Sequence, residues 1–266
     1  MYAFDYRRPT TLAEAETALK GIAGAKILAG GQTLLPALKL RLNRHPCIVD
    51  LSAVGGLAAI ARKGDTLSIG AMATHVQVAE SKDVAAAIPG LAQLAEAIGD
   101  PQVRNRGTIG GSLANNDPAA DYPAAVLALN ATLKTTRRSI AADDFFKGLF
   151  ATALDDNEIL TEIAFPRPKR FAYAKFANPA SRFALVGVAV ADTASGPRVA
   201  VTGAGSSGVF RAREMEAALG KSFAPESLAK IKIEASMLTS DIHAAADYRA
   251  HLIGVMVKRA VQAALA

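Results

Sequence analysis

Two glycine turns hold the residues of this sequence whose types and spacing could do chemistry. One is Ala29-Gly30-Gly31-Gln32-Thr33, and the other runs from Thr108 through Gly110-Gly111 to Asp117. Paired glycines allow positive φ and lack the Cβ atoms that would keep a ligand away from the backbone, so consecutive N–H groups can converge on an anion. A phosphate or pyrophosphate is the expected ligand, and two tight turns without any ligand are the alternative.

Neither turn matches the best-known nucleotide-binding motifs. Both lack the Gly-Lys-Ser/Thr ending of a phosphate-binding loop and the six-residue glycine fingerprint of a Rossmann unit. The two turns therefore indicate anion binding without indicating either of those enzyme classes.

Three charged residues outside the glycine pairs are further candidates. Asp117 and Asp121 lie four residues apart, but Pro118 separates them and no histidine is near, so a metal site is not favoured. Asp121 is better explained as a hydrogen-bond acceptor for a ribose or adenine group, and Asp117 as a cap or turn former. Lys175 lies in an alternating strand pattern, which leaves open whether it is a solvated lysine or a functional cation.

The other reactive side chains predict neither a metal centre nor a catalytic nucleophile. The histidines at positions 45, 75, 243 and 251 have no ligand spacing. Ser112 has no base in any known nucleophile pattern. The single cysteine, Cys47, excludes an iron–sulfur cluster supplied by this chain alone, so any cluster must come from a partner.

Charge and hydropathy restrict the class of protein. The formal net charge of +6 comes from small, scattered basic groups, whereas a nucleic-acid-binding protein usually concentrates them on one face or interleaves them with aromatics. No run approaches the roughly 18 apolar residues of a membrane span, and the N-terminus has no apolar signal core. We therefore expect a cytoplasmic protein without nucleic acid and without a membrane span.

The hydrophobic pattern predicts two lobes in the first part of the chain. Residues 1–55 are expected to form a small α/β lobe, with helices at 11–21 and 34–41 and strands at 25–29 and 47–51. In the second lobe a hairpin is expected at 59–70, and helices are expected at 74–81 and 88–98. The polar stretch 99–118 is predicted to be the least core-like part of the chain, and the segments at 124–136, 143–150 and 158–165 complete the lobe.

The segment Pro166-Arg167-Pro168-Lys169-Arg170 is the predicted domain boundary, because two prolines and three cations do not suit a helix interior or a central strand. Beyond it, strands at 171–176, 185–191 and 198–204 predict an antiparallel sheet. Helices are expected at 211–219, 225–236 and 246–264. The C-terminal part is therefore predicted to be an α+β domain.

Three segments carry a resemblance to a known family. Residues 29–36 (AGGQTLLP), 108–114 (TIGGSLA) and 117–121 (DPAAD) resemble the signature segments of the medium, FAD-binding subunits of the xanthine dehydrogenase and carbon monoxide dehydrogenase family, the molybdenum hydroxylases. The similarity extends over nearly the whole chain, from Phe4-Asp5-Tyr6 through Ile159-Leu160 and Lys175 to the C-terminal part. The order and separation of the motifs and the chain length agree as well.

The resemblance implies an α+β fold of two domains. Residues 1–168 would form a PCMH-type FAD-binding domain like that of the vanillyl-alcohol-oxidase flavoproteins, with α/β lobes at about 1–55 and 56–168. Residues 169–266 would form a C-terminal α+β domain with an antiparallel sheet, like that of the carbon monoxide dehydrogenase flavoprotein.

The resemblance also implies noncovalent FAD, with its pyrophosphate wrapped by both glycine turns and backbone N–H groups as the main donors. Lys175 is expected near the isoalloxazine ring, where it would stabilise the reduced anionic flavin. The positions implied to contact FAD are Leu28, Ala29, Gly30, Gly31, Gln32, Thr33, Leu34, Leu35, Ile98, Thr108, Ile109, Gly110, Gly111, Ser112, Asn115, Asp117, Asp121, Leu160 and Lys175.

The implied function is electron transfer. In such enzymes a large subunit holds the molybdenum cofactor and a small subunit holds two 2Fe–2S clusters, so an (αβγ)₂ complex is expected, with electrons passing through the flavin to an external acceptor. Two other classes remain as alternatives: a self-contained flavin oxidase or reductase, and a non-catalytic nucleotide-binding module. The resemblance implies neither the organic substrate nor the acceptor, and Phe183 stands where many relatives have a tyrosine near the flavin.

Overall fold

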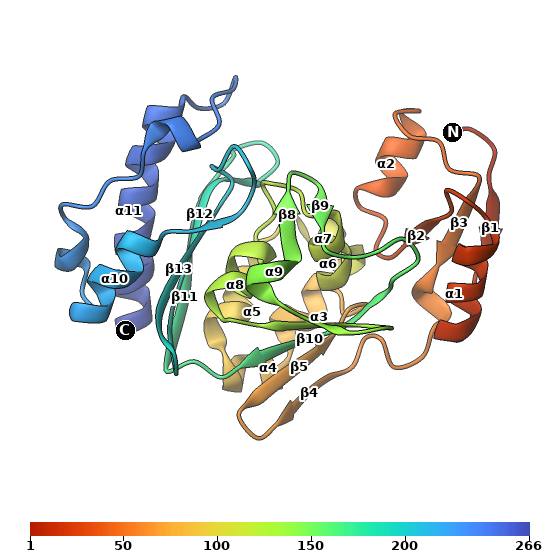
Figure 1. Ribbon diagram of the computed structural model, residues 1–266, viewed down its shortest axis with the longest axis horizontal. Coiled ribbons are helices and arrows are strands. Elements are labelled where there is room, and N and C mark those ends of the chain that lie inside the picture. The colour runs from red at the N-terminus through yellow and green to blue at the C-terminus, as the bar shows by residue number, and fades with distance from the viewer.

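Three main sheets follow one another along the longest axis of the molecule (Figure 1). The computed structural model describes all residues 1–266. The first sheet is parallel, with its strands in the order β1 (Asp5–Arg7), β3 (Cys47–Asp50) and β2 (Lys26–Leu28). Helices α1 (Leu12–Gly21) and α2 (Leu34–Lys39) complete this N-terminal lobe, which confirms the predicted α/β lobe.

The second lobe is built on an antiparallel sheet. Its strand order is β4 (Ile60–Lys63), β5 (Thr66–Gly70), β10 (Leu160–Pro166), β6 (Thr132–Thr135) and β7 (Ser139–Ala141), and the β4–β5 pair confirms the predicted hairpin. The other elements of this lobe are α3 (His75–Glu80), α4 (Lys82–Ala87), α5 (Pro89–Glu96), α6 (Pro101–Arg106), α7 (Ile109–Asn115), α8 (Tyr122–Ala128), α9 (Ala142–Phe145), β8 (Phe146–Gly148) and β9 (Ala151–Thr152).

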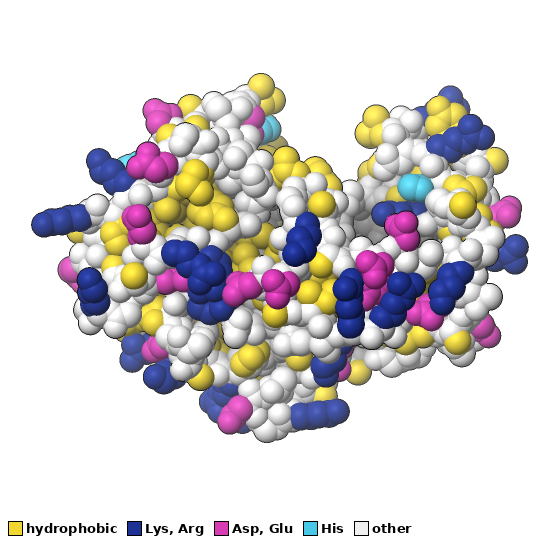
Figure 2. All heavy atoms as spheres, in the orientation of Figure 1, with side chains coloured by type: hydrophobic (Ala, Val, Ile, Leu, Met, Phe, Trp, Pro, Cys, Tyr) yellow, Lys and Arg dark blue, Asp and Glu magenta, His cyan; other side chains and the backbone are white.

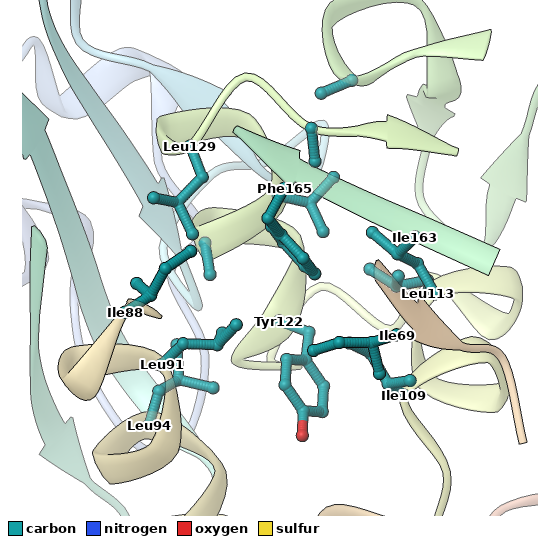
Figure 3. Packing of buried hydrophobic residues seen from close by; sticks show 14 of the residues in the cluster. Ile69, Ile88, Leu91, Leu94, Ile109, Leu113, Tyr122, Leu129, Ile163 and Phe165 are labelled. Atoms are coloured by element: carbon teal, nitrogen blue, oxygen red, sulfur yellow. The ribbon is translucent and has the colours of Figure 1, made fainter. Parts of the chain in front are cut away.

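The stretch 99–118 is more core-like than its polarity suggested. It forms α6 and α7, and Ile109 and Leu113 of α7 are fully buried with Ile69, Ile163 and Phe165 in the largest core of the molecule (Figure 3). The expectation of a largely non-core segment was wrong because the two apolar residues lie four apart, on one face of a short helix.

The expected linker is shorter than predicted. Pro166 is the last residue of β10 and Arg170 is the first residue of β11 (Arg170–Ala177), so residues 167–169 alone lie between them. A proline fits at a strand end, where no further ladder N–H is needed. The domain boundary at 168/169 itself stays a prediction.

The third sheet is antiparallel and has helices on both faces. Its order is β11, β12 (Ala184–Thr193), β13 (Gly196–Thr202) and β14 (Phe210–Arg211). Helix α11 (Ala246–Leu265), expected from the sequence, packs on β11 and β12, and α10 (Arg213–Lys221) packs on β13. On the opposite face, α5 and α8 of the second lobe pack against the same sheet (Figure 1).

Strand β12 contributes residues to the cores on both faces of the third sheet. Val186, Val188 and Val190 belong to the core beneath α11, whereas Ala189 and Ala191 belong to the core of the second lobe. Successive strand residues point to opposite faces, so small residues face α8 and branched ones face α11. The FAD-binding part predicted at 1–168 and the C-terminal part therefore share a buried surface.

The helix predicted at 225–236 was wrong. This segment contains only two 3-10 turns, η2 (Pro225–Leu228) and η3 (Ala235–Met237). Between them Ile231 and Ile233 pack against the C-terminal core while Lys230 and Lys232 are exposed. That alternation of exposed and packed residues has the period of an extended chain and does not fit a helix.

None of the helices of the molecule is both long and apolar enough to cross a bilayer.

A network of two nearly buried arginines and the exposed carboxylate of Asp143 joins the third sheet to the second lobe. Arg198 of β13 donates to the Leu127 carbonyl oxygen at 2.8 Å and to Asp143 at 2.6 Å, and Arg211 donates to Asp143 at 3.0 Å. Arg211 also donates to Glu216 at 2.7 and 2.8 Å. Burial and the neighbouring Arg211 lower the pKa of Arg198, and the Asp143 carboxylate opposes that shift. Asp143 is thus the shared acceptor between the two parts of the chain.

Replacing Asp143 by Ala should lower the free energy of unfolding by about 2 kcal/mol, since two guanidinium groups lose a charged acceptor. Urea unfolding of wild type, Asp143→Ala and Asp144→Ala measures the effect. Asp144 is the matched control because it is exposed and makes no ion pair. Equal losses in the two variants would show that the network does not stabilise the interface.

Candidate functional site

The first glycine turn leaves a row of backbone donors free. The N–H groups of the five residues from Ala29 to Thr33 have no hydrogen-bond acceptor within the chain. Gly30 is buried, and Gly31 has a φ of 74°, in the left-handed region that favours glycine. Gln32 and Thr33 are exposed and can donate to water, but buried N–H groups are nearly always paired, so the free N–H of Gly30 and its half-buried neighbours mark a place for a ligand rich in acceptor oxygens.

The structure brings the two predicted glycine turns into contact. A Cβ atom on Gly30 would lie 2.1 Å from the carbonyl oxygen of Arg106 and 2.6 Å from Cα of Gly107. A Cβ atom on Gly111 would lie 3.4 Å from Cβ of Ala29. Glycine at position 30 is therefore required for the N-terminal lobe to reach the second lobe, in addition to any role in ligand approach.

The second glycine turn uses most of its amides inside the protein. Ile109 N–H donates to Ala73, Gly110 N–H donates to Ala71, and Gly111 N–H donates to the Thr108 side chain that caps α7. A Cβ atom on Gly110 would lie 2.5 Å from Cβ of Ala71. The expectation that backbone N–H groups are the main ligand donors does not hold for this turn, where only the Thr108 amide is free.

A cavity of about 290 Å³ lies where the turns meet. Its lining includes Ala29, Gly30, Ser52, Arg106 and Thr108. Figure 2 shows the surface hollowed between the N-terminal lobe and the rest of the molecule. A larger cavity of about 410 Å³ lies between α10 and η2 and contains no predicted site residue. The smaller cavity is therefore the candidate site.

Asp121 and Lys175 meet in a second cluster. The Lys175 ammonium lies 2.9 Å from an Asp121 oxygen and 3.1 Å from the Ala97 carbonyl oxygen, next to Ile98. Tyr173 donates to the same carboxylate at 2.6 Å. Burial raises the pKa of Asp121, and the Lys175 charge opposes that shift.

This cluster changes two expectations. The Lys175 side chain is 7% exposed and ion-paired, so it is not a solvated strand lysine. Both oxygens of the buried Asp121 carboxylate have partners within the chain, so they already serve this cluster, and the expected contact with a ribose or adenine group stays a prediction. The pair is electrically neutral, which also weakens the expected direct effect of Lys175 on a flavin.

The other predicted site residues surround the turns or lie in the core. Leu28 and Leu35 pack against Gly31, and a Cβ atom there would lie 3.1 Å and 2.8 Å from their methyl carbons. Leu160 is buried in β10, in the core of the second lobe. The rest are half-buried or exposed at the turns, namely Gln32, Thr33, Leu34, Ser112 and Asn115.

Asn116 was missed among the candidate residues. It follows α7 with a φ of 45°, and its side chain donates to the carbonyl oxygens of Gly148 and Ala151 at 2.7 and 2.8 Å. Asparagine tolerates the left-handed region, so its place after a helix was a usable signal. The next residue, Asp117, accepts from Ala119 N–H at 2.9 Å, which confirms it as a turn former.

His75 was also missed, because an isolated histidine carries no motif. It is the first residue of α3, is buried, and its ring centroid lies 5.4 Å from that of Tyr122. A Cβ atom on Gly107 would lie 2.5 Å from His75 Nε2, so the ring supports the turn that meets Gly30. Burial, with the nearby Arg104 charge, lowers the pKa of His75 to about 4.

The pKa of His75 predicts a pH-dependent stability. Above pH 6.5 the His75 ring is neutral in both the folded and the unfolded protein. Between pH 6.5 and about 4 only the unfolded protein takes up the proton, so the free energy of unfolding falls as the pH falls. The total loss should reach about 3 kcal/mol. Chemical unfolding at several pH values should show a shallower slope for His75→Leu than for wild type in this window. Parallel curves would contradict the buried, neutral ring.

Two family models divide the chain between them. Residues 2–168 match the FAD binding domain in molybdopterin dehydrogenase, and residues 171–264 match the C-terminal domain of the CO dehydrogenase flavoprotein. Both glycine turns and the Asp121 position lie within the first match, and Lys175 lies within the second.

Full-length relatives and solved structures agree with these models. The chain is 38% identical to the carbon monoxide dehydrogenase medium chain of Hydrogenophaga pseudoflava, covering 99% of this chain and 97% of the relative. It is 36% identical to the nicotine 6-hydroxylase medium subunit of Paenarthrobacter nicotinovorans, covering 97% and 96%. Quinoline 2-oxidoreductase from Pseudomonas putida 86 contains a chain of similar structure, with a TM-score of 0.90, 33% identity and coverage of 99% and 98%. The chain therefore belongs to the FAD-binding medium subunits of the molybdenum hydroxylases, the oxidoreductase family that includes xanthine dehydrogenase and carbon monoxide dehydrogenase.

Proposed function

We propose that this chain binds FAD noncovalently between its first two lobes and transfers electrons within a molybdenum hydroxylase complex. The observation that carries the proposal is the row of free N–H groups from Ala29 to Thr33, held against the second glycine turn. A pyrophosphate offers the several anionic oxygens that such a row requires. When bound, FAD supplies a carrier that can take up electrons and release them.

The residues of the chain fit this cofactor in three ways. The free amides of the first turn would hold the pyrophosphate, with Thr108 N–H and the Ser112 hydroxyl as further donors. Leu28 and Leu35, packed on Gly31, fix the conformation of that turn. The neutral cluster of Asp121, Tyr173 and Lys175 would form a preorganised wall for another part of FAD, with Ile98 next to the Ala97 carbonyl that Lys175 contacts and Leu160 in the core behind the site.

The similarity to medium chains over nearly the full length favours electron transfer over a self-contained oxidase, and the lining of the cavity agrees with it. That lining includes Ser52, Thr74, Gln77 and Asn105, with Arg106 as its single charged group, and no Asp, Glu, His, Lys or Tyr. An oxidase that acts on its own organic substrate needs a general acid or base at the flavin. The turn cavity, which would hold the pyrophosphate, offers none, and the medium-chain relatives favour chemistry on the organic substrate at another subunit.

We infer that the partners are an iron–sulfur small subunit and a molybdenum-cofactor large subunit, in an (αβγ)₂ complex. The curated relatives are medium chains by name, which implies larger and smaller companions. The one cysteine of this chain, Cys47, is buried in the N-terminal lobe and cannot ligate a cluster alone. In this proposal the flavin passes its electrons to an external acceptor. The cytoplasmic location of the complex stays a prediction.

Replacing Gly31 by Val should strip FAD from the chain. A β-branched residue at a φ of 74° costs roughly 1–3 kcal/mol and would push against Leu35, so the turn changes shape where its free amides lie. The flavin absorption of the purified protein, normalised to protein concentration, measures the occupancy. Wild type should show close to one FAD per chain.

Gly64→Val is the matched control for this experiment. Gly64 also has a positive φ, of 58°, but it lies at the β4–β5 turn with open space around it. The Gly64→Val variant should therefore lose about as much stability as Gly31→Val but keep its flavin. Full flavin occupancy in Gly31→Val, or equal loss in both variants, would contradict a cofactor role of the first turn.

Replacing Lys175 by Met should destabilise the protein by roughly 3 kcal/mol, because it leaves the Asp121 carboxylate buried without its partner. The double variant Lys175→Met with Asp121→Asn removes both charges and should recover most of that loss in urea unfolding. If the pair also shapes the cofactor wall, FAD affinity should recover along with stability. Affinity that stays low in a stable double variant would instead assign Lys175 a direct contact with FAD.

A further inference from the structure

The loop after α2 presents two leucines to solvent. We define the α2 tip as residues 39–44, at the upper end of the N-terminal lobe in Figure 1. Leu40 is 71% exposed and Leu42 is 72% exposed. An apolar side chain of this size gains roughly 2 kcal/mol when it is buried, so a close pair of exposed leucines favours contact with another apolar surface.

The backbone of the α2 tip is fixed rather than loose. Leu42 N–H donates to the Ala37 carbonyl oxygen at 2.9 Å, and Arg41 N–H donates to that of Leu38 at 3.1 Å. These two bonds form the helix-ending motif whose left-handed position is normally glycine. Here that position is Arg41, with a φ of 59°. The tip keeps an arginine in a strained conformation between its two exposed leucines, and such strain is concentrated at functional sites.

The charge of the α2 tip has one sign. Lys39, Arg41 and Arg44 are its charged residues, and the stretch from Leu34 to Pro46 contains no acidic residue. The guanidinium carbons of Arg41 and Arg44 lie 5.6 and 5.5 Å from the centre of the Tyr2 ring, which orients both groups. Figure 2 shows dark blue and yellow side chains together at the top of the N-terminal lobe.

We propose that the α2 tip docks an acidic surface of another subunit of the complex, with Leu40 and Leu42 entering an apolar hollow and Arg41 and Arg44 pairing with carboxylates around it. The combination of a small apolar centre and a charged rim is typical of protein interfaces. Helix α2 starts directly after the glycine turn, so the docked subunit would lie within about 10 Å, the length of this helix, from the cofactor turn. This inference rests on the proposed function, since it names a docking site for its partners.

Neither of two other occupants fits the α2 tip as well. A second copy of this chain that met the first tip to tip would place the same cations against each other, at a cost in repulsion. A membrane surface would attract the arginines, but two leucines on a short loop offer little area for insertion. Complementary carboxylates on a partner subunit satisfy the charges and the leucines together.

The test uses the complex that co-purifies with the tagged full-length chain. Its dissociation is measured by analytical ultracentrifugation over a range of salt concentrations, for wild type, Arg41→Glu/Arg44→Glu and Leu40→Ser/Leu42→Ser. The charge-reversed and serine variants should each weaken association by roughly 10- to 100-fold, and the charge-reversed variant should lose much of the salt dependence. Flavin content and thermal unfolding of each variant show that it remains folded.

Lys230→Glu/Lys232→Glu is the matched control, because it makes the same change in net charge at exposed positions of the C-terminal domain. It should leave assembly unchanged. Unaltered association of both tip variants would overturn the docking site while leaving the proposed function standing. Wild type that purifies alone would overturn the assembly part of the proposed function as well. Binding of the tip to vesicles of anionic phospholipid, lost in the variants while assembly is unaffected, would assign the tip to a membrane instead.

Discussion

The contact between Gly30 and the end of α6 is the constraint on which the candidate site depends. The first turn lies against the carbonyl oxygen of Arg106 and the Cα of Gly107 so closely that no side chain fits between them. Behind that contact, the His75 ring fills the space next to Gly107 and rests on Tyr122 in the core. The free amides of the first turn thus belong to the N-terminal lobe, but their position is set by the core of the second lobe.

The two glycine turns have different tasks although their sequences look alike. The first turn leaves its amides unpaired and offers them to a ligand. The second turn gives its amides to Ala71, Ala73 and its own cap, and Gly110 allows α7 to pack closely on Ala71, just after β5. One turn therefore supplies donors and the other supplies a rigid support. This division is what preorganised anion binding needs, because donors that do not move cost little entropy when the ligand arrives.

The third sheet joins the C-terminal part of the chain firmly to the second lobe. Its alanines face α8, its valines face α11, and the carboxylate of Asp143 joins Arg198 and Arg211 across the junction. Lys175 reaches from β11 to Asp121 and to the end of α5, so a strand of the C-terminal part contributes to a cluster formed mainly by the second lobe. Through the Lys175–Asp121 pair, the C-terminal sheet is therefore in direct contact with the second lobe.

Local sequence determined those features that depend on near neighbours. The alternation of β12 and the glycine pairs are readable from the sequence because they depend on residues that lie next to each other or on a fixed period. Local pattern was misleading at 225–236, where Ile231 and Ile233 are placed by the distant α11 core, and at 99–118, where two apolar residues were enough for burial. Only the tertiary structure decided that Lys175 pairs with Asp121, that His75 supports Gly107, and that the amides of one turn are free while those of the other are used. The physical reason is that each of these facts depends on what lies across a contact between segments far apart in the chain, and no local pattern encodes that partner.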